Sequence, residues 1–270
     1  MTTDANSDYL KINQQSWDKR VGVHIDSDFY DVQGFINGKQ VLNDIELSLL
    51  GDVKGKKILH LQCHFGQDSL ALQQLGAEVV GLDFSPKAIE YAKNLADKMN
   101  LNAQFVCADV YSASTVIQDT FDIVFTSYGT IGWLPDIDKW AKVVRHFLKP
   151  NGQFIMAEFH PVLWMYNNEF TEITYDYFKT TPIVEEQSGT YANADSEIQV
   201  NDITWNHSLS EVFNALKSNG LMVDSFEEFN YSPYNCFQNM QEIGPNKFVI
   251  STIKPQIPMV YALRAIPFKQ

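Results

Sequence analysis

The chain has 270 residues, and 45% of them are hydrophobic, which is enough to bury a substantial core. This composition excludes disordered and collagen-like classes and predicts one α/β domain with an elaboration. The formal net charge of −13 at pH 7 disfavours nucleic acid as a partner, because binding to phosphates depends on Lys and Arg.

The cysteines and the N-terminal residues indicate in which cellular compartment the protein is expected. Cys63, Cys107 and Cys236 show neither a CxxC pair nor a Cys/His spacing typical of zinc, so we expect buried thiols and no metal site. The stretch from Met1 to Asp8 is polar and acidic, unlike a signal peptide. No apolar run approaches the ~20 residues that a membrane-spanning helix needs. We therefore expect a cytoplasmic protein without membrane contact, and the sequence leaves its oligomeric state open.

A regular alternation of strands and helices is expected after an N-terminal extension. Residues 1–50 are predicted to form a largely helical N-terminal extension or lid. Residues 51–160 alternate short apolar runs with amphipathic segments, which is typical of βαβ units in a parallel sheet. The expected strands are 57–63, 78–83, 103–107, 121–127 and 153–159.

Helices are expected between these strands, at 67–75, 86–99 and 138–148. The second begins clearly, because Ser85 is a good N-cap and Pro86 suits the first helical position. The segment Lys149-Pro-Asn-Gly152 is predicted to stop the third helix and turn the chain into the next strand.

Beyond His160 the alternation ends. Residues 161–206 are predicted to form an inserted antiparallel cap, with exposed strands at 171–178 and 196–205. Residues 207–270 are expected to close the fold with a helix at 208–219 and strands at 221–229 and 259–266. The whole chain, 1–270, is predicted to be a single domain.

The turn after the first strand is a candidate ligand site. It lies between a strand and a helix, where free backbone N–H groups can bind a polar ligand and Gly66 permits close approach. Asp83, at the carboxyl end of the second strand, can accept hydrogen bonds from both hydroxyls of a ribose. It can instead cap the next helix, although Ser85 already suits that role. A cofactor-using enzyme is therefore the first hypothesis.

Together with later stretches, these residues resemble the class I S-adenosylmethionine-dependent methyltransferases over about residues 55–160, with 221–266 as the closing strands. The matching stretches are His60-Leu-Gln-Cys-His-Phe-Gly66, Gly81-Leu-Asp-Phe-Ser-Pro-Lys-Ala-Ile89, Phe105-Val-Cys-Ala-Asp-Val110, Phe121-Asp-Ile-Val-Phe-Thr-Ser-Tyr128 and Leu148-Lys-Pro-Asn-Gly-Gln-Phe-Ile155. The resemblance implies an α/β, Rossmann-like sheet of seven strands with helices on both faces, in which only the last strand is antiparallel. It also implies S-adenosyl-L-methionine as the cofactor, bound across the carboxyl ends of the first four strands.

The resemblance further implies roles for single residues. Asp83 would bind the ribose, Phe84 would pack on the adenine, and Asp109 would accept from its exocyclic amine. Val110 would lie alongside the adenine, and Ser127 and Tyr128 would flank the methionine moiety. The other residues expected at the cofactor are Gln62, Cys63, His64, Gly66 and Asp68.

The first motif departs from the family pattern. Gln62 and His64 stand where the family usually has glycines, and His60 stands where it usually has an acidic residue; only Gly66 is retained. The change affects how the amino-acid end of the cofactor would be held, and His64 is expected to shape the turn. No G-x-G-x-x-G follows a strand, which argues against a dinucleotide-binding oxidoreductase.

A general base is needed only if the methyl acceptor starts protonated. The candidates are His160 at the end of the fifth strand and His207 before the helix at 208–219, with His24 as a third. Tyr128 is a further catalytic candidate. His160 can instead hold a strand end, and His207 can instead hold a helix start.

Aromatic side chains near the expected site are candidates for a lid. They can form a lid that excludes water, although core packing explains aromatic residues equally well. The lid candidates are Tyr9, Trp17, Phe29, Tyr30, Tyr128, Trp133, Trp164 and Tyr166.

The sequence leaves the acceptor and two functional alternatives open. We expect a small-molecule acceptor enclosed by the cap and the extension, and a protein acceptor is the alternative substrate. The other hypotheses are a cofactor-binding protein without turnover and an NAD(P) oxidoreductase on a similar sheet.

Overall fold

The computed structural model describes residues 5–178 and 180–268. Residues 1–4, part of the polar stretch discussed above, lie outside the described residues. The chain divides into two compact units. The first contains the chain up to Leu42, Asp52–Phe121 and Ile183–Thr204, and the second contains the rest.

Three parallel strands form the sheet of the first unit. They are β1 (Lys57–Leu61), β2 (Glu78–Asp83) and β3 (Gln104–Cys107). In register, His60 lies opposite Gly81 and Asp83 lies opposite Cys107. Because the carboxyl ends of parallel strands share one edge, the turn after β1 and Asp83 meet there.

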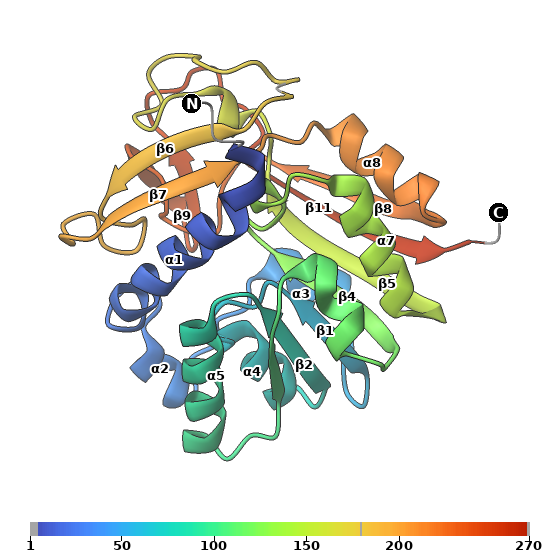
Figure 1. Ribbon diagram of the computed structural model, residues 1–270. Helices are drawn as coiled ribbons and strands as arrows, with labels where there is room; N and C mark the ends of the chain where they lie inside the picture. Colours follow the sequence, from blue (N-terminus) through green and yellow to red (C-terminus); the bar gives the residue numbers. More distant parts are fainter. Residues whose placement is uncertain (1–4, 179, 269–270) are drawn as a thin grey trace. The chain divides into compact units, whose positions relative to one another are not determined.

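Helices and one hairpin complete the first unit. The helices are α1 (Ala5–Ile25), α2 (Val32–Ile36), α4 (Gln67–Gln74), α5 (Pro86–Lys98), the 3₁₀ helix η1 (Val110–Ser112) and α6 (Ala113–Val116), and the hairpin strands are β6 (Ile183–Ser188) and β7 (Gln199–Thr204). Ser85 caps α5 as predicted, since its Oγ accepts from Ala88 N–H at 3.1 Å. Helix α1 runs beside β7, so segments far apart in sequence lie together (Figure 1).

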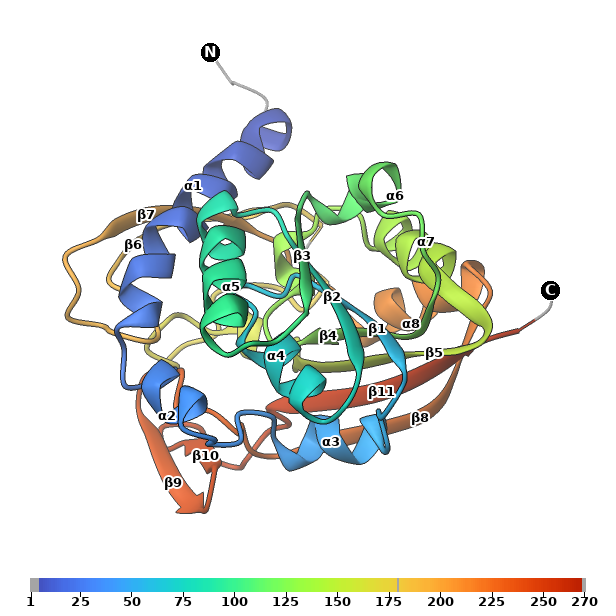
Figure 2. The same ribbon diagram turned by 90° about the horizontal axis from the view of Figure 1, so that it is seen from below.

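The second unit is also α/β. Its elements are α3 (Asp44–Leu50), β4 (Phe121–Ser127), η2 (Ile131–Trp133), α7 (Ile137–Phe147), β5 (Leu148–Phe159), η3 (Leu163–Met165), α8 (Leu209–Ser218), β8 (Leu221–Phe229), β9 (Met240–Gly244), β10 (Lys247–Ile250) and β11 (Val260–Pro267). Strand β11 is antiparallel to both β5 and β8. Helix α3 packs on β5 and β11, while α7 and α8 cover the opposite face (Figure 2).

The strand order of the large sheet is β3-β2-β1-β4-β5-β11-β8. This seven-stranded sheet confirms the predicted fold class. Strands 78–83, 121–127 and 221–229 also have the predicted bounds.

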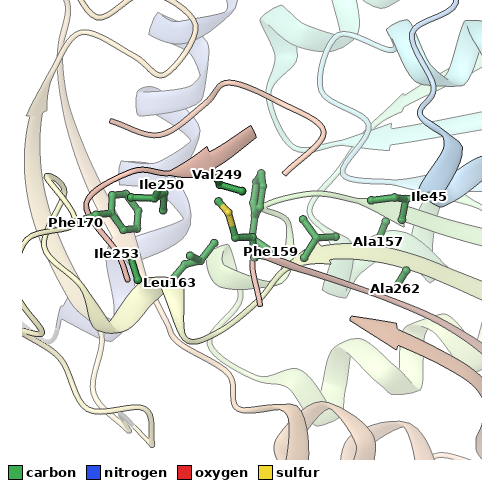
Figure 3. Packing of buried hydrophobic residues seen from close by; sticks show 11 residues of the cluster. Ile45, Ala157, Phe159, Leu163, Phe170, Val249, Ile250, Ile253 and Ala262 are labelled. Atoms are coloured by element: carbon green, nitrogen blue, oxygen red, sulfur yellow. The ribbon is translucent and has the colours of Figure 1, made fainter. Parts of the chain in front are cut away.

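One buried apolar cluster joins the β9–β10 hairpin to strands β5 and β11 of the second unit (Figure 3). Its members are Ile45, Ala157, Phe159, Leu163, Phe170, Val249, Ile250, Ile253, Met259, Val260 and Ala262. Removing such side chains from water contributes roughly 25 cal/mol per Å² of apolar area. The cluster therefore stabilises a hairpin that the sequence analysis did not predict.

Two predictions for the local structure are wrong. Strand β5 begins at Leu148 instead of following a turn at 149–152, because Leu148 is buried and already extended, with φ −80° and ψ 131°. Residues 171–178 are no strand, since Ile173 makes only an isolated bridge to Tyr166 and is 62% exposed. The cap hairpin consists instead of β6 and β7, of which only β7 falls within the predicted 196–205.

The expectation of three buried thiols is only partly right. Cys63 is buried and Cys236 is partly buried, whereas Cys107 is exposed at the end of β3. All three are free thiols. Cys107 is exposed because it is the last residue of a strand at the edge of the sheet.

Candidate functional site

The turn after β1 keeps a backbone shape that glycine usually supplies. Gln62 has φ 55° and His64 has φ 50°, and Gly66 has φ 80°. Left-handed backbone costs a residue with a Cβ roughly 1–2 kcal/mol, so the surrounding structure must hold the turn. One such contact is the hydrogen bond from Cys63 N–H to the carbonyl of Leu82, at 2.9 Å. The turn therefore has a glycine-like backbone while carrying the side chains of Gln62 and His64.

The ring of Phe105 explains why two positions remain glycine. A Cβ on Gly66 would lie 2.5 Å from Phe105 Cε1 and 2.9 Å from the Ala92 methyl carbon. A Cβ on Gly81 would lie 2.7 Å from Phe105 Cδ1 and 2.9 Å from Cys63 Sγ. Real Cβ atoms do not approach so closely, so both glycines are required for packing.

Asp83 is held at the carboxyl end of β2 by two backbone groups. His64 N–H donates to Oδ2 and Ser85 N–H donates to Oδ1, each at 2.9 Å. Burial raises the pKa of Asp83 to about 6, and the two N–H groups act in the opposite direction. Each carboxylate oxygen has a second lone pair, so a pair of ribose hydroxyls fits this group.

His60 is buried and neutral where the family usually has an acidic residue. Its Nδ1 lies 2.8 Å from Ser69 Oγ, and burial lowers the pKa of His60 to about 3. The first motif therefore offers no carboxylate to a ligand at this position.

The carboxylate of Asp109 caps the short helix η1. It accepts from Tyr111 N–H at 3.0 Å and from Ser112 N–H at 3.2 Å. Val110 beside it is buried, and Asp68 lies partly exposed in the first turn of α4. The adenine-binding role of Asp109 stays a prediction, because its capping bonds alone account for its position.

Helix α1 is attached to the turn that follows β2. Gln14 Nε2 donates to the carbonyl of Phe84 at 2.7 Å, and Ser85 Oγ donates to Asp18 Oδ1 at 2.6 Å. The Phe84 side chain is partly buried. The N-terminal extension thus contacts the segment expected to bind the cofactor.

The same helix is fastened to the cap hairpin. Arg20 and Asp202 form a buried ion pair at 2.5 Å, and both side chains are only 4% exposed. Asn13 exchanges two hydrogen bonds with the backbone of Ile203, at 2.8 and 2.9 Å. Extension, cap hairpin and cofactor turn are therefore one connected assembly within the first unit.

Two histidines meet inside this assembly. His24 Nδ1 of α1 lies 2.9 Å from His64 Nε2 of the turn, and we call these two residues the imidazole pair. The pKa of His24 is lowered to about 2 and the pKa of His64 to about 3, in both cases mainly because the ring is buried. Both rings are therefore neutral at physiological pH.

Aromatic rings surround the imidazole pair. Tyr30 stacks on His24 with ring centroids 5.2 Å apart, and Tyr191 lies 4.8 Å from the same ring. Trp17 meets His64 edge-on at 5.1 Å. Three lid candidates from the extension, Trp17, Phe29 and Tyr30, gather here with Tyr191, which the sequence analysis missed.

The other aromatic candidates with described packing lie in the second unit. Tyr128, Trp164 and Tyr166 pack against the buried cluster of Figure 3. Their burial there is explained by core packing.

In the second unit, Tyr128 contacts a buried carboxylate. Its hydroxyl donates to Glu46 Oε2 at 2.7 Å, and its backbone is left-handed with φ 36°. Burial raises the pKa of Glu46, while Asn43 N–H donates to its other oxygen at 2.6 Å. Ser127, which precedes Tyr128 in the chain, is partly exposed. Glu46 was not predicted, because in the sequence it is one acidic residue of a helix.

A second buried carboxylate shapes the loop after β4. Glu158 accepts from the backbone N–H groups of Gly129, Thr130 and Ile131, and burial raises its pKa. This carboxylate was also missed. Its three bonds to consecutive N–H groups show a role in fixing the loop that begins with Tyr128.

His160 has both ring nitrogens next to groups of the chain. Val162 N–H donates to Nδ1 at 3.3 Å, and Glu228 Oε1 lies 2.9 Å from Nε2. Burial lowers the pKa of His160, and Glu228 opposes this shift. These contacts suit a residue that holds the end of β5, and a catalytic role stays a prediction.

His207 is similarly engaged. Its Nε2 lies 2.7 Å from the carbonyl oxygen of Leu134, and its Nδ1 lies 3.0 Å from Glu211 Oε1. The ring is buried at the start of α8. Its catalytic role likewise stays a prediction, and its contacts favour the alternative of holding the helix start.

Comparison with known proteins connects these features to a family. Residues 58–152 match the family model described as a methyltransferase domain. A ubiquinone biosynthesis O-methyltransferase of Coxiella burnetii is 29% identical over 133 residues, which cover 48% of this chain and 56% of that protein. An uncharacterised methyltransferase of Synechocystis is 31% identical over 133 residues, covering 48% of this chain and 60% of that protein. The chain thus spans little more than half the length of these curated relatives.

The fold comparison reaches further along the chain. A putative S-adenosylmethionine-dependent methyltransferase from Listeria monocytogenes matches with a TM-score of 0.54 and 19% identity, over 82% of this chain and 95% of that one. At this identity the match shows the fold. No helix within residues 5–178 and 180–268 has the length and apolar character needed to cross a bilayer. Residues 58–152 therefore match a methyltransferase domain, and the sheet has the fold of an S-adenosylmethionine-dependent methyltransferase.

Proposed function

We propose that this protein transfers a methyl group from S-adenosyl-L-methionine to a small-molecule acceptor. The observation that carries the proposal is the position of Asp83, whose carboxylate is fixed by two N–H groups beside the glycine-like turn. The matched methyltransferase domain contains both features. The name of the Coxiella relative, an O-methyltransferase, supports a small acceptor.

The chain's own residues would bind and orient the cofactor. Asp83 would accept from the ribose hydroxyls, Phe84 and Val110 would contact the adenine, and the turn from Gln62 to Gly66 would follow the cofactor closely. The cofactor would supply a methyl group on a sulfonium, which is attacked in line. The protein's contribution is then to hold the acceptor aligned and to keep water out.

The roles assigned to Ser127 and Tyr128 at the methionine moiety remain part of the proposal. Tyr128 is supported by its left-handed backbone and by its bond to Glu46, because both fix the direction of its ring. The loop that carries it is further fixed by Glu158. Residues so constrained are typical of functional sites.

We also propose a cytoplasmic location and no nucleic-acid acceptor. Three free thiols suit a reducing compartment. The net charge of −13 repels phosphate backbones.

Calorimetry with S-adenosylmethionine and S-adenosylhomocysteine tests the cofactor, with NAD as the control ligand. Micromolar binding of either sulfur compound and none of NAD is expected. An acceptor screen that measures release of S-adenosylhomocysteine then separates an enzyme from a binding protein. If NAD bound and both sulfur compounds did not, an oxidoreductase would replace the proposal.

A further inference from the structure

Two buried nitrogen atoms of the imidazole pair lack a partner. His24 Nε2 and His64 Nδ1 have no hydrogen bond to any group in the described part of the chain. His24 is fully buried, with an exposed fraction of 0%. Buried polar atoms in native proteins nearly always have a partner, so a ligand or an ordered water is the expected partner of each nitrogen.

The inner contact of the pair fixes what the outer atoms can do. His24 Nδ1 and His64 Nε2 are 2.9 Å apart, so one of them donates a single shared hydrogen to the other. In a neutral pair, one outer nitrogen then carries a hydrogen and the other a lone pair. When a proton enters at the outer lone pair, the shared hydrogen can move across and the hydrogen on the other outer nitrogen can leave, after which the two outer atoms have exchanged these roles.

The pair lies where the cofactor turn meets the variable parts of the chain. His64 belongs to the matched domain, and its N–H binds Asp83. His24 and Tyr191 belong to the extension and to the loop of the cap hairpin, outside the matched residues 58–152. In a methyltransferase such segments determine the acceptor, because the shared domain binds the common cofactor.

We propose that the imidazole pair receives the proton of the methyl acceptor, and that the acceptor is a small hydroxyl compound with an aromatic body. This inference rests on the proposed function. The rings of Trp17, Tyr30 and Tyr191 pack against the two imidazoles and make the surroundings of the pair aromatic and largely apolar, which favours an aromatic body over a charged one.

The chemistry balances for a hydroxyl group. The oxygen–methyl bond forms as the sulfur–methyl bond breaks, and the sulfonium charge passes to the oxygen. The O–H bond then breaks, its electron pair stays on oxygen, and the proton goes to the lone pair of an outer nitrogen. Movement of the shared hydrogen allows the other outer nitrogen to release a proton to water.

The surroundings explain why a hydroxyl is favoured over an amine. Burial and the Arg20 charge keep the pKa of both imidazoles low, so a lone pair is available at physiological pH. The other charges near the pair are Asp202, which binds Arg20, and Asp83. A base this weak still takes a proton from an oxonium, which is a very strong acid, but not from the much weaker acid that a methylated ammonium is.

Imidazole nitrogen NMR tests the inference without an identified substrate. Protein labelled with ¹⁵N at histidine is saturated with S-adenosylhomocysteine and titrated with phenol, or with anisole, which has no hydroxyl proton. Phenol should shift an outer nitrogen signal of His24 or His64, and anisole should not. His24→Gln and His64→Gln assign the signals, and either one suffices if the other does not fold.

The variants also give a binding readout. Phenol affinity should fall at least fivefold in His64→Gln, whereas His146→Gln, an exposed position on α7, should leave it unchanged. If saturating phenol shifts neither imidazole, or if anisole gives the same shifts, the inference is overturned while S-adenosylhomocysteine binding upholds the proposed function. Failure of S-adenosylhomocysteine to bind would overturn the proposed function itself.

Discussion

Asp83 combines a buried carboxylate with two backbone hydrogen bonds and two remaining lone pairs. Asp83→Asn should weaken S-adenosylhomocysteine binding about tenfold to hundredfold, because hydrogen bonds to a charged group contribute roughly 1.5–3 kcal/mol. Calorimetry measures the change. Asp119→Asn, at a side chain 60% exposed, is the matched control and should not alter affinity. Equal affinity in wild type and Asp83→Asn would disprove the ribose role.

Cofactor affinity should depend on pH through the same group. Burial raises the pKa of Asp83 to about 6, so the carboxyl becomes neutral as the pH falls through that value. A neutral carboxyl is a weaker acceptor, and the dissociation constant of S-adenosylhomocysteine should therefore rise between pH 7 and pH 5. Calorimetry across this range should show a flat profile for Asp83→Asn. A flat wild-type profile would contradict the prediction.

Gly66 and Gly38 allow backbone strain to be separated from steric overlap. Both have positive φ, but a Cβ on Gly66 would overlap Phe105 while one on Gly38 meets nothing within 4 Å. Gly66→Ala should lower the free energy of unfolding by about 1–3 kcal/mol more than Gly38→Ala, which is the usual cost of overpacking. Urea unfolding gives both values. Equal losses would mean that the Phe105 ring moves aside without cost.

At the level of single residues, the sequence predicts less of the site than of the fold. Asp83 lies at the end of its strand and Ser85 caps its helix as predicted, since both positions follow from signals that are local in sequence. The imidazole pair joins positions 40 residues apart, and its contact depends on the path of α1. The one available signal was the replacement of a motif glycine by His64.

Among the elements, α1 depends on its ion pair with the cap hairpin. Arg20→Ala should lower the free energy of unfolding by about 3–5 kcal/mol, because Asp202 would remain buried without its partner. Thermal or urea unfolding measures the loss. Lys39→Ala removes an exposed ion pair with Asp31, and we expect no measurable effect there. Similar stability of the two variants would show that water reaches Asp202.

The helices and strands of the βα core were predictable because their signals are local. Helix α5 has a cap, a first-turn proline and an apolar stripe within 13 residues. The strands of the cap were predictable only in part, since β7 falls within the predicted 196–205 but is held by α1, which lies far away in sequence. The segment 171–178 alternates in sequence but finds no partner strand among the described residues.

For the whole molecule, charge limits the partners. The net charge of −13 should prevent binding to a single-stranded RNA or double-stranded DNA oligonucleotide at physiological salt. Fluorescence anisotropy with labelled oligonucleotides measures this. Salt-sensitive binding at micromolar protein would require a basic patch that outweighs the net charge.

Because Gln62 and His64 have left-handed backbone, the contribution of their side chains can be tested separately from that of the backbone path of the turn. Its backbone already has the dihedral angles that glycine prefers, so changing either residue to glycine removes a side chain without asking the chain to take a new path. In most proteins such a change alters contacts and conformation together. Here Gln62→Gly and His64→Gly would convert the first motif stepwise toward the common family pattern and would show what each added side chain contributes to ligand choice.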